Sequence, residues 1–219
     1  LKFWSGAMVV LPVFLQAPWA HLQPLTACLF TFVILGFGVL LAQKGGPKWF
    51  NAGALLIGVS GSWLGGCLFW GWLRSHPVFH IPVEAIAMPI ALVGLNTRWR
   101  VASAFYLAAL LGTAFTDVSM VMTGVMNKWP SVINATFQEA PEILNQTAQE
   151  LMTPISISSL LLVALLILFL SRLMSEKANT SSIAKSAWLV ASAALTTTLW
   201  VDGLFLLTAV FHPRLSGLI

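Results

Sequence analysis

The sequence predicts an all-α fold, a polytopic membrane helical bundle of about seven transmembrane helices. Among its 219 residues, 58% are hydrophobic and only 8% are charged, whereas about 25% of the residues of a soluble domain are charged. About seven apolar runs approach the length of roughly 20 residues that crosses a bilayer core about 30 Å thick. We therefore expect a single transmembrane domain over residues 1–219.

The charges argue against a nucleic-acid partner. The formal net charge of +4 arises from 11 basic and 7 acidic residues, which are too few to form a basic surface. Membrane lipids are expected partners instead. Cys28 and Cys67 both lie in apolar runs, which favours free buried thiols over a disulfide or a metal site. Because the sequence begins at Leu1 rather than at Met, we expect further residues to precede it.

The first three runs are separated by one tight turn and one polar loop. The runs over about 4–19 and 24–42 follow each other through a short turn, which predicts a helical hairpin. The loop over 43–48 contains Gly, Pro and two Lys, residues that end a helix and keep a loop in water. A third helix is expected over about 51–71.

Small residues recur along the third run at helical spacing. Gly58, Ser62 and Gly66 follow one another every four positions, and Gly61 with Gly65 forms a GxxxG pattern. Such a face lets another helix backbone approach closely. We therefore expect this helix at the centre of the bundle, and we favour packing within the chain over a homodimer interface.

The fourth run, over about 81–96, is short for a transmembrane span. It contains Pro82 and Pro89, so it is expected to be tilted, kinked at Pro89 or flanked by residues that snorkel to the interface. A longer fifth run follows over about 101–126 and contains Asp117.

Residues 127–153 form a sizeable polar segment, predicted to lie at the outer surface. One helical face of this segment carries its apolar residues, namely Ala140, Leu144, Ala148 and Leu151. This periodicity predicts a short amphipathic helix on the membrane surface. The sixth span is expected over about 154–173 and the seventh over about 186–210, with a polar linker over 175–182 between them.

The positive charges predict the orientation of the bundle, because short cytoplasmic loops accumulate Lys and Arg. With the N-terminus inside, eight basic residues fall on the inner side: Lys2, Lys44, Lys48, Arg98, Arg100, Arg172, Lys177 and Lys185. Three fall on the outer side: Arg74, Lys128 and Arg214. We therefore expect a cytoplasmic N-terminus and a C-terminus on the lumenal or outer side.

In this topology the intramembrane carboxylates share one leaflet. Glu84, Asp117 and Asp202 all reach a similar depth near the outer side, at about 1.5 Å of rise per helical residue. A charge at depth costs about 2.5 to 3.5 kcal/mol, so these side chains are expected to lie together. Arg74 is the expected counter-ion, above all for Glu84, with His80 at the margin of the cluster. The cluster is either a structural network or a functional site.

The histidines His21, His76, His80 and His212 all fall at the outer side. Neutral imidazole is a common ligand of metals and of the central atoms of chlorophyll and haem. His76 and His80 are the candidate pigment or metal ligands, although Pro77 and Pro82 interrupt the helix that would align them. The alternative is a histidine that binds a headgroup or a loop carbonyl.

The chain carries no HExxH, CxxC, GxSxG or phosphate-binding Gly loop. Hydrolase and nucleotide chemistry therefore have no support from motifs. We expect that the protein is not an enzyme, although a membrane enzyme that uses His76 or His80 is a third alternative.

Four sequence segments carry a resemblance to a known family. These are Leu11-Pro-Val-Phe-Leu-Gln-Ala-Pro18, Trp70-Gly-Trp-Leu-Arg74, His80-Ile-Pro-Val-Glu-Ala-Ile86 followed by Pro89, and Leu111-Gly-Thr-Ala-Phe-Thr-Asp117. Over roughly residues 9–150 the chain resembles a family of cyanobacterial integral membrane proteins of unknown function. The resemblance implies a photosynthetic organism with thylakoid membranes.

Two functions follow from these observations. The first is a non-catalytic accessory or assembly subunit of a photosynthetic thylakoid complex, which would contact photosystem subunits and hold chlorophyll, carotenoid or lipid at its helix surface. The alternative is a small proton-coupled transporter that uses Glu84, Asp117 and Asp202. The lack of internal repeats and the confinement of the three acids to the outer half weigh against transport.

Overall fold

Seven apolar spans run along the bundle in the part of the chain that the structure describes. The structure is a computed structural model and describes residues 1–136 and 138–211. Within this part of the chain, seven helices are long and apolar enough to span a membrane, and no strand occurs. The predicted fold class is therefore confirmed.

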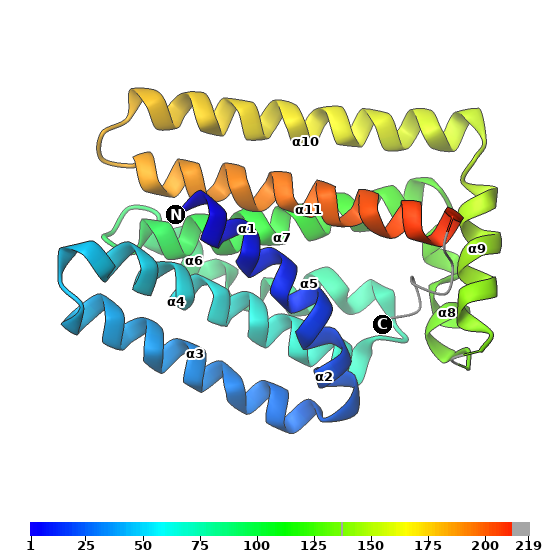
Figure 1. The fold of residues 1–219 in the computed structure, drawn as a ribbon, viewed down its shortest axis with the longest axis horizontal. Helices are drawn as coiled ribbons and strands as arrows, with labels where there is room; N and C mark the ends of the chain where they lie inside the picture. The colour runs from blue at the N-terminus through cyan, green and yellow to red at the C-terminus, as the bar shows by residue number, and fades with distance from the viewer. Residues whose placement is uncertain (137, 212–219) are drawn as a thin grey trace.

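Successive spans follow one another in alternating directions along the bundle (Figure 1). The first span consists of α1 (Lys2–Leu11), a π-helical turn (Pro12–Gln16) and α2 (Ala17–Leu22). It is followed by α3 (Pro24–Lys44) and by α4 (Pro47–Leu68), which continues into a second π-helical turn (Phe69–Leu73). The fourth span contains the short helices α5 (His80–Glu84) and α6 (Met88–Gly94).

The second half of the chain adds α7 (Arg100–Met122), α8 (Trp129–Asn134), α9 (Ala140–Glu150), α10 (Pro154–Thr180) and α11 (Lys185–Phe211). In Figure 1, α8 and α9 run across the end of the bundle rather than along it. We call this end the capped end, and we call the opposite end, where loops 45–46, 95–99 and 181–184 lie, the loop end. The sequence predicts that the capped end is the outer one.

Two predicted boundaries were wrong. The fifth span ends at Met122 rather than near 126, because Gly124 takes a left-handed conformation with φ of 76° and begins a new turn. The sixth span continues to Thr180, so most of the predicted linker is helical. Its polar residues include no Pro or Gly, and Lys177 lies 5.1 Å from the Trp188 ring, so the helix extends beyond its apolar stretch.

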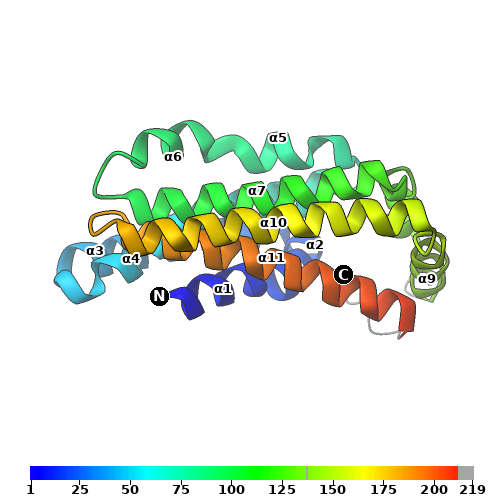
Figure 2. The same cartoon turned by 90° about the horizontal axis from the view of Figure 1, so that it is seen from above.

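The central position of α4 is confirmed. In the most apolar stretch of this span, 61% of the residues are buried, against at most 22% in the other described spans. Figure 2 shows α5 and α6 on one side of α7, with α1 on the other side of the bundle. Near the loop end, residues of α4, α7 and α11 form a core that includes Ala54, Phe105 and Ala194.

Candidate functional site

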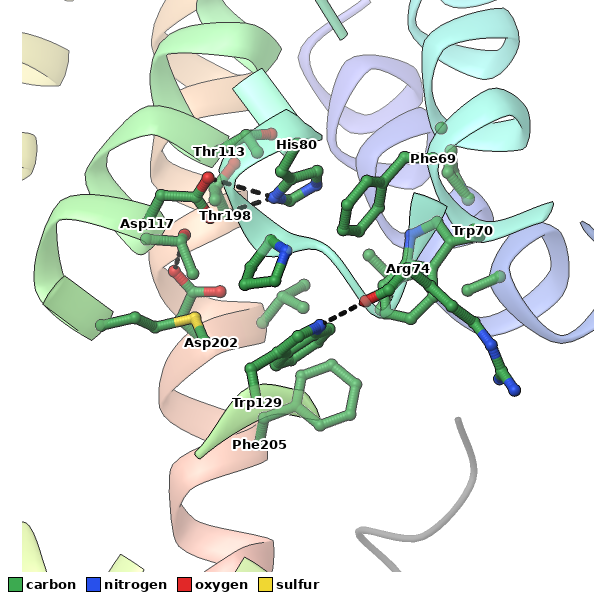
Figure 3. A pocket seen from close by; sticks show the side chains of 18 of the residues that line it. Phe69, Trp70, Arg74, His80, Thr113, Asp117, Trp129, Thr198, Asp202 and Phe205 are labelled. Carbon is green, nitrogen blue, oxygen red and sulfur yellow. Dashed lines mark hydrogen bonds and ion pairs between the residues drawn. The ribbon is translucent and has the colours of Figure 1, made fainter. Parts of the chain in front are cut away.

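A pocket of about 660 Å³ occupies the half of the bundle next to the capped end. Its walls come from the first span, α4, α5, α7 and α11, and the helices α8 and α9 lie across its end. Most of the lining is apolar or aromatic, and a small number of polar groups point into it (Figure 3). This composition is typical of a site for a small organic molecule.

Three spans depart from regular α-helix where they border this pocket. Two of them contain the π-helical turns Pro12–Gln16 and Phe69–Leu73. The third breaks into the 3-10 turns Pro77–Phe79 and Ala85–Ala87 around α5. Irregular backbone at membrane depth is tolerated where it is buried in protein or lines a cavity, and π-helical turns are frequent at functional sites.

Side chains from neighbouring helices hold two of these irregular segments in place. Gln16 donates a hydrogen bond to the carbonyl of Trp63, and its Nε2 lies 3.2 Å from Cys67 Sγ. The hydroxyl of Tyr106 donates to the carbonyl of Glu84 and accepts a 3.1 Å bond from the amide of Ala87. The Gln16 bonds tie the first π-helical turn to α4, and the Tyr106 bonds satisfy backbone groups of the broken fourth span.

His80 forms the centre of a polar cluster in the pocket wall. Its Nδ1 lies 3.0 and 3.2 Å from the two carboxylate oxygens of Asp117, and its Nε2 lies 3.4 Å from Oε1 of Glu84. The imidazole also stacks on Phe69, with ring centroids 4.1 Å apart. One histidine thus links two carboxylates from α5 and α7.

Asp202 joins this cluster from α11. Its Oδ2 accepts a 2.6 Å hydrogen bond from Thr116 Oγ1, and Thr116 precedes Asp117 on α7. Its Oδ1 accepts no hydrogen bond from a described residue and points into the pocket. The structure therefore brings Glu84, Asp117 and Asp202 to one site, as the sequence predicts.

The predicted pairing of Arg74 with Glu84 was wrong. Arg74 makes no ion pair with any residue in 1–136 or 138–211, and its guanidinium points away from Asp117 and Asp202 (Figure 3). Its carbonyl instead accepts a 2.7 Å hydrogen bond from Trp129 Nε1. Partial burial lowers the pKa of Arg74, with no carboxylate opposing that shift. His80 occupies the position predicted for this counter-ion.

Both ring nitrogens of His80, one of the two candidate pigment or metal ligands, face carboxylates. His76 is exposed and meets Phe79 edge-on at 6.4 Å between ring centroids. Within the described part of the chain, no three His, Cys, Asp or Glu side chains are grouped to hold a metal ion. His21 lines the pocket, whereas His212 and Arg214 lie outside the described residues.

The small residues of α4 face other helices of the same chain. A Cβ at Gly58 would clash with the Ala102 carbonyl oxygen, and one at Gly65 would lie 2.8 Å from the Glu84 Cα. Gly61 faces the Tyr106 ring and Gly66 faces the Gln16 side chain. Ser62 lines the pocket, and its buried Oγ has no hydrogen-bond partner among the described residues.

The apolar face of α9 turns toward the pocket rather than toward lipid. Ala140, Leu144, Ala148 and Leu151 all line the pocket. Asn145 Nδ2 donates hydrogen bonds of 2.9 and 3.1 Å to the carbonyls of Ala209 and Val210 at the end of α11. Lys128, which precedes α8, pairs with Glu150. The predicted amphipathic helix is therefore a cap on the bundle.

The sequence did not single out Gln16, Tyr106, Thr116 or Trp129 as site residues. Thr116 stands beside Asp117, which is a usable signal. The other three are recognised only from contacts between helices that are distant along the chain.

The fold and the site define a class: a polytopic helical membrane protein with a partly polar pocket inside its bundle. The chain belongs to a family described as protein of unknown function (DUF3120), whose model matches residues 5–210. The family therefore extends over the last two spans, beyond the region in which the sequence segments showed the resemblance. No curated protein and no solved structure matches the chain.

Proposed function

We propose that the protein is a non-catalytic carrier that binds a small organic solute in the pocket and couples its movement to protons. The observation that carries this proposal is a titratable cluster in the wall of a sizeable pocket inside a membrane bundle. A volume of about 660 Å³ lies within the range of small-molecule sites, roughly 300 to 1,000 Å³.

Coupling to protons is supported by the make-up of the cluster. Imidazole is the side chain that titrates nearest to neutral pH. His80 faces Glu84 on its own helix, Asp117 on α7 and the Phe69 ring, and Asp202 reaches the same region from α11. A solute that enters the pocket alters the surroundings of these groups, so binding and proton uptake become linked.

The pocket reaches the capped end, whereas the loop end is closed by packed side chains such as Val59, Phe105 and Val190. Transport therefore requires the core near the loop end to separate while the capped end closes. The broken fourth span is suited to such a movement, because discontinuous helices recur at the binding sites of transporters.

The test uses proteoliposomes loaded with a pH-sensitive dye. A panel of small aromatic solutes, cationic, neutral and anionic, is added outside, and proton movement is recorded. At least one solute is expected to move protons in the wild type and not in Asp117→Asn. Glu176→Gln, which alters an exposed carboxylate of α10, serves as the control. If no member of the panel binds or moves protons, the carrier proposal fails.

A second candidate is the accessory or assembly subunit of a photosynthetic complex in a cyanobacterial thylakoid membrane. It is favoured by the fourth span, where only 6% of the most apolar stretch is buried although the backbone is broken. Lipid leaves unpaired backbone groups unsatisfied, so a partner protein such as a photosystem subunit, or a bound chlorophyll or carotenoid, would suit this face. Gentle purification should then recover a pigment-protein complex, and recovery without partners would contradict it.

A further inference from the structure

We infer that the ligand of the pocket is an organic cation with an apolar or aromatic body. This inference rests on the proposed function, because it names the chemical class of the solute that the same pocket takes. It is carried by two features of the pocket wall, its charge and its aromatic surface.

The charged groups of the wall leave negative charge unmatched. Glu84, Asp117 and Asp202 all line the pocket, and the single positive charge that His80 can carry lies between the first two. Asp202 is held by a hydroxyl of Thr116 and not by a cation. Its free Oδ1 can therefore accept a hydrogen bond from, or pair with, a positively charged ligand.

Three basic residues besides His80 line the pocket, namely His21, Arg74 and Lys128, and none of them forms an ion pair with Glu84, Asp117 or Asp202 in the described part of the chain. Lys128 pairs with Glu150, which lies outside the pocket lining. The Arg74 guanidinium points away from Asp117 and Asp202 (Figure 3). An anionic ligand would therefore meet carboxylates without a facing cation, and this repulsion excludes it.

The remaining wall is aromatic. Phe69, Trp70, Trp129 and Phe205 line the pocket and surround the space beside the carboxylates. The rings of Trp70 and Trp129 meet edge to face at 5.8 Å, so they form a continuous surface. Aromatic faces attract cations, most strongly where water is excluded. Unmatched carboxylates and aromatic rings in the same wall therefore favour a ligand that carries both a positive charge and apolar surface.

The experiment compares three probes of similar size: phenyltrimethylammonium, its neutral isostere tert-butylbenzene, and benzenesulfonate. Binding to the purified full-length protein in nanodiscs is measured at pH 8 by tryptophan fluorescence and by thermal shift. We expect phenyltrimethylammonium to bind at least about tenfold more tightly than the neutral probe. Benzenesulfonate is expected not to bind.

Three variants distinguish binding through the Asp202 charge from apolar binding in the pocket and from nonspecific binding. Asp202→Asn keeps an acceptor for Thr116 and removes the charge, so it should weaken the cation about tenfold and leave the neutral probe unchanged. Ala109→Phe places a ring in the pocket lining and should remove binding of both probes. Glu176→Gln should change neither.

The outcomes distinguish the inference from the proposed function. Equal affinity for the cation and the neutral probe, both lost in Ala109→Phe, overturns the cation preference and leaves the pocket as a solute site. Preference for benzenesulfonate overturns it as well. If none of the three probes binds in a manner that Ala109→Phe abolishes, the proposed solute-binding function is overturned together with the inference.

Discussion

The two halves of the bundle are built from the same spans in different ways. Near the loop end, the first span, α4, α7 and α11 pack small apolar side chains against each other, with Ala54, Val190 and Ala194 fully buried. Near the capped end, the same four spans and α5 surround a pocket, with His80 of α5, Asp117 of α7 and Asp202 of α11 in its wall. In α7 the residues near the loop end pack into the core, whereas those near the capped end line the pocket.

This difference indicates a division of roles. Close packing of small residues provides stability, because the interior tolerates little change of volume. The pocket half gives up such contacts and compensates with hydrogen bonds and ion pairs between helices, which are satisfied only in one arrangement. Substitutions in the two halves should therefore have different consequences, and four predictions test this.

The largest effect is expected from Asp117→Leu. This change removes the carboxylate that faces His80 Nδ1, and breaking a buried pair costs about 3 to 5 kcal/mol. Ser5→Ala is the comparison near the loop end, because it removes a 2.8 Å bond to the Val190 carbonyl, which is worth about 0.5 to 1.5 kcal/mol. Unfolding in detergent measures both, and equal losses would contradict a polar network that stabilises the pocket half.

The second prediction uses neighbouring residues of α7. Ala108 is 3% exposed in the packed core, whereas Ala109 lines the pocket. Ala108→Phe should destabilise by about 1 to 3 kcal/mol, because a filled core must move to admit a ring. Ala109→Phe should cost less, since its ring enters the pocket. A larger loss for Ala109→Phe in thermal unfolding would show that the pocket does not accept a side chain.

The third prediction concerns the attachment of α9. Asn145→Leu removes two hydrogen bonds to the final carbonyls of α11, a change worth roughly 1 kcal/mol. Hydrogen exchange should rise in α9 and stay unchanged in the loop-end half of α4. Uniform acceleration over the whole chain would instead indicate that the cap is part of the global unfolding unit.

The smallest effect is expected where the chain enters α9. Thr136 Oγ1 lies 2.7 Å from Glu139 Oε2, and the Glu139 amide donates to the same hydroxyl. With the 3.2 Å bond from the Thr136 amide to Glu139 Oε2, they form a capping box, and the bonds from Thr136 lower the pKa of Glu139. The folded-state pKa of Glu139 lies below its unfolded value. The ionised Glu139 carboxylate therefore stabilises the start of α9 above the unfolded pKa, and this stabilisation is lost as pH falls through the folded-state pKa.

The protection of α9 amides, measured relative to their intrinsic exchange rates at each pH, should therefore fall on acidification through this range, and Thr136→Ala should make this protection insensitive to pH. Retention of the full pH response in Thr136→Ala would assign the response to another group. Asn145→Leu provides a matched control, because it loosens α9 without altering the capping box.

Much of the fold could be predicted from the sequence because lipid imposes simple rules. Long apolar runs gave the seven spans, and Pro82 and Pro89 indicated the broken fourth one. Rise per residue placed Glu84, Asp117 and Asp202 at one depth. Depth depends only on position along a helix, so one sequence suffices for it.

The partner of each carboxylate could not be predicted, because it depends on how helices are rotated about their axes. That rotation is set by contacts between distant residues, such as Gly65 against Glu84 and Tyr106 against the Glu84 carbonyl. The direction of Arg74 is set by the π-helical turn Phe69–Leu73 that precedes it. Nothing in the composition of that stretch distinguishes a π turn from an α turn.

The π-helical turn at Phe69–Leu73 also makes the direction of Arg74 sensitive to the insertion or deletion of one residue. A π turn holds one residue more than the α turn it replaces, so removing a single residue there would restore regular helix. Each residue of an α-helix advances the chain by about 100° around the axis. A relative lacking that residue would therefore present Arg74 in another direction, and a cation beside Glu84 could take over the part played by His80. Deleting one residue of Phe69–Leu73 from this chain is therefore expected to redirect the Arg74 side chain by about 100° around the helix axis.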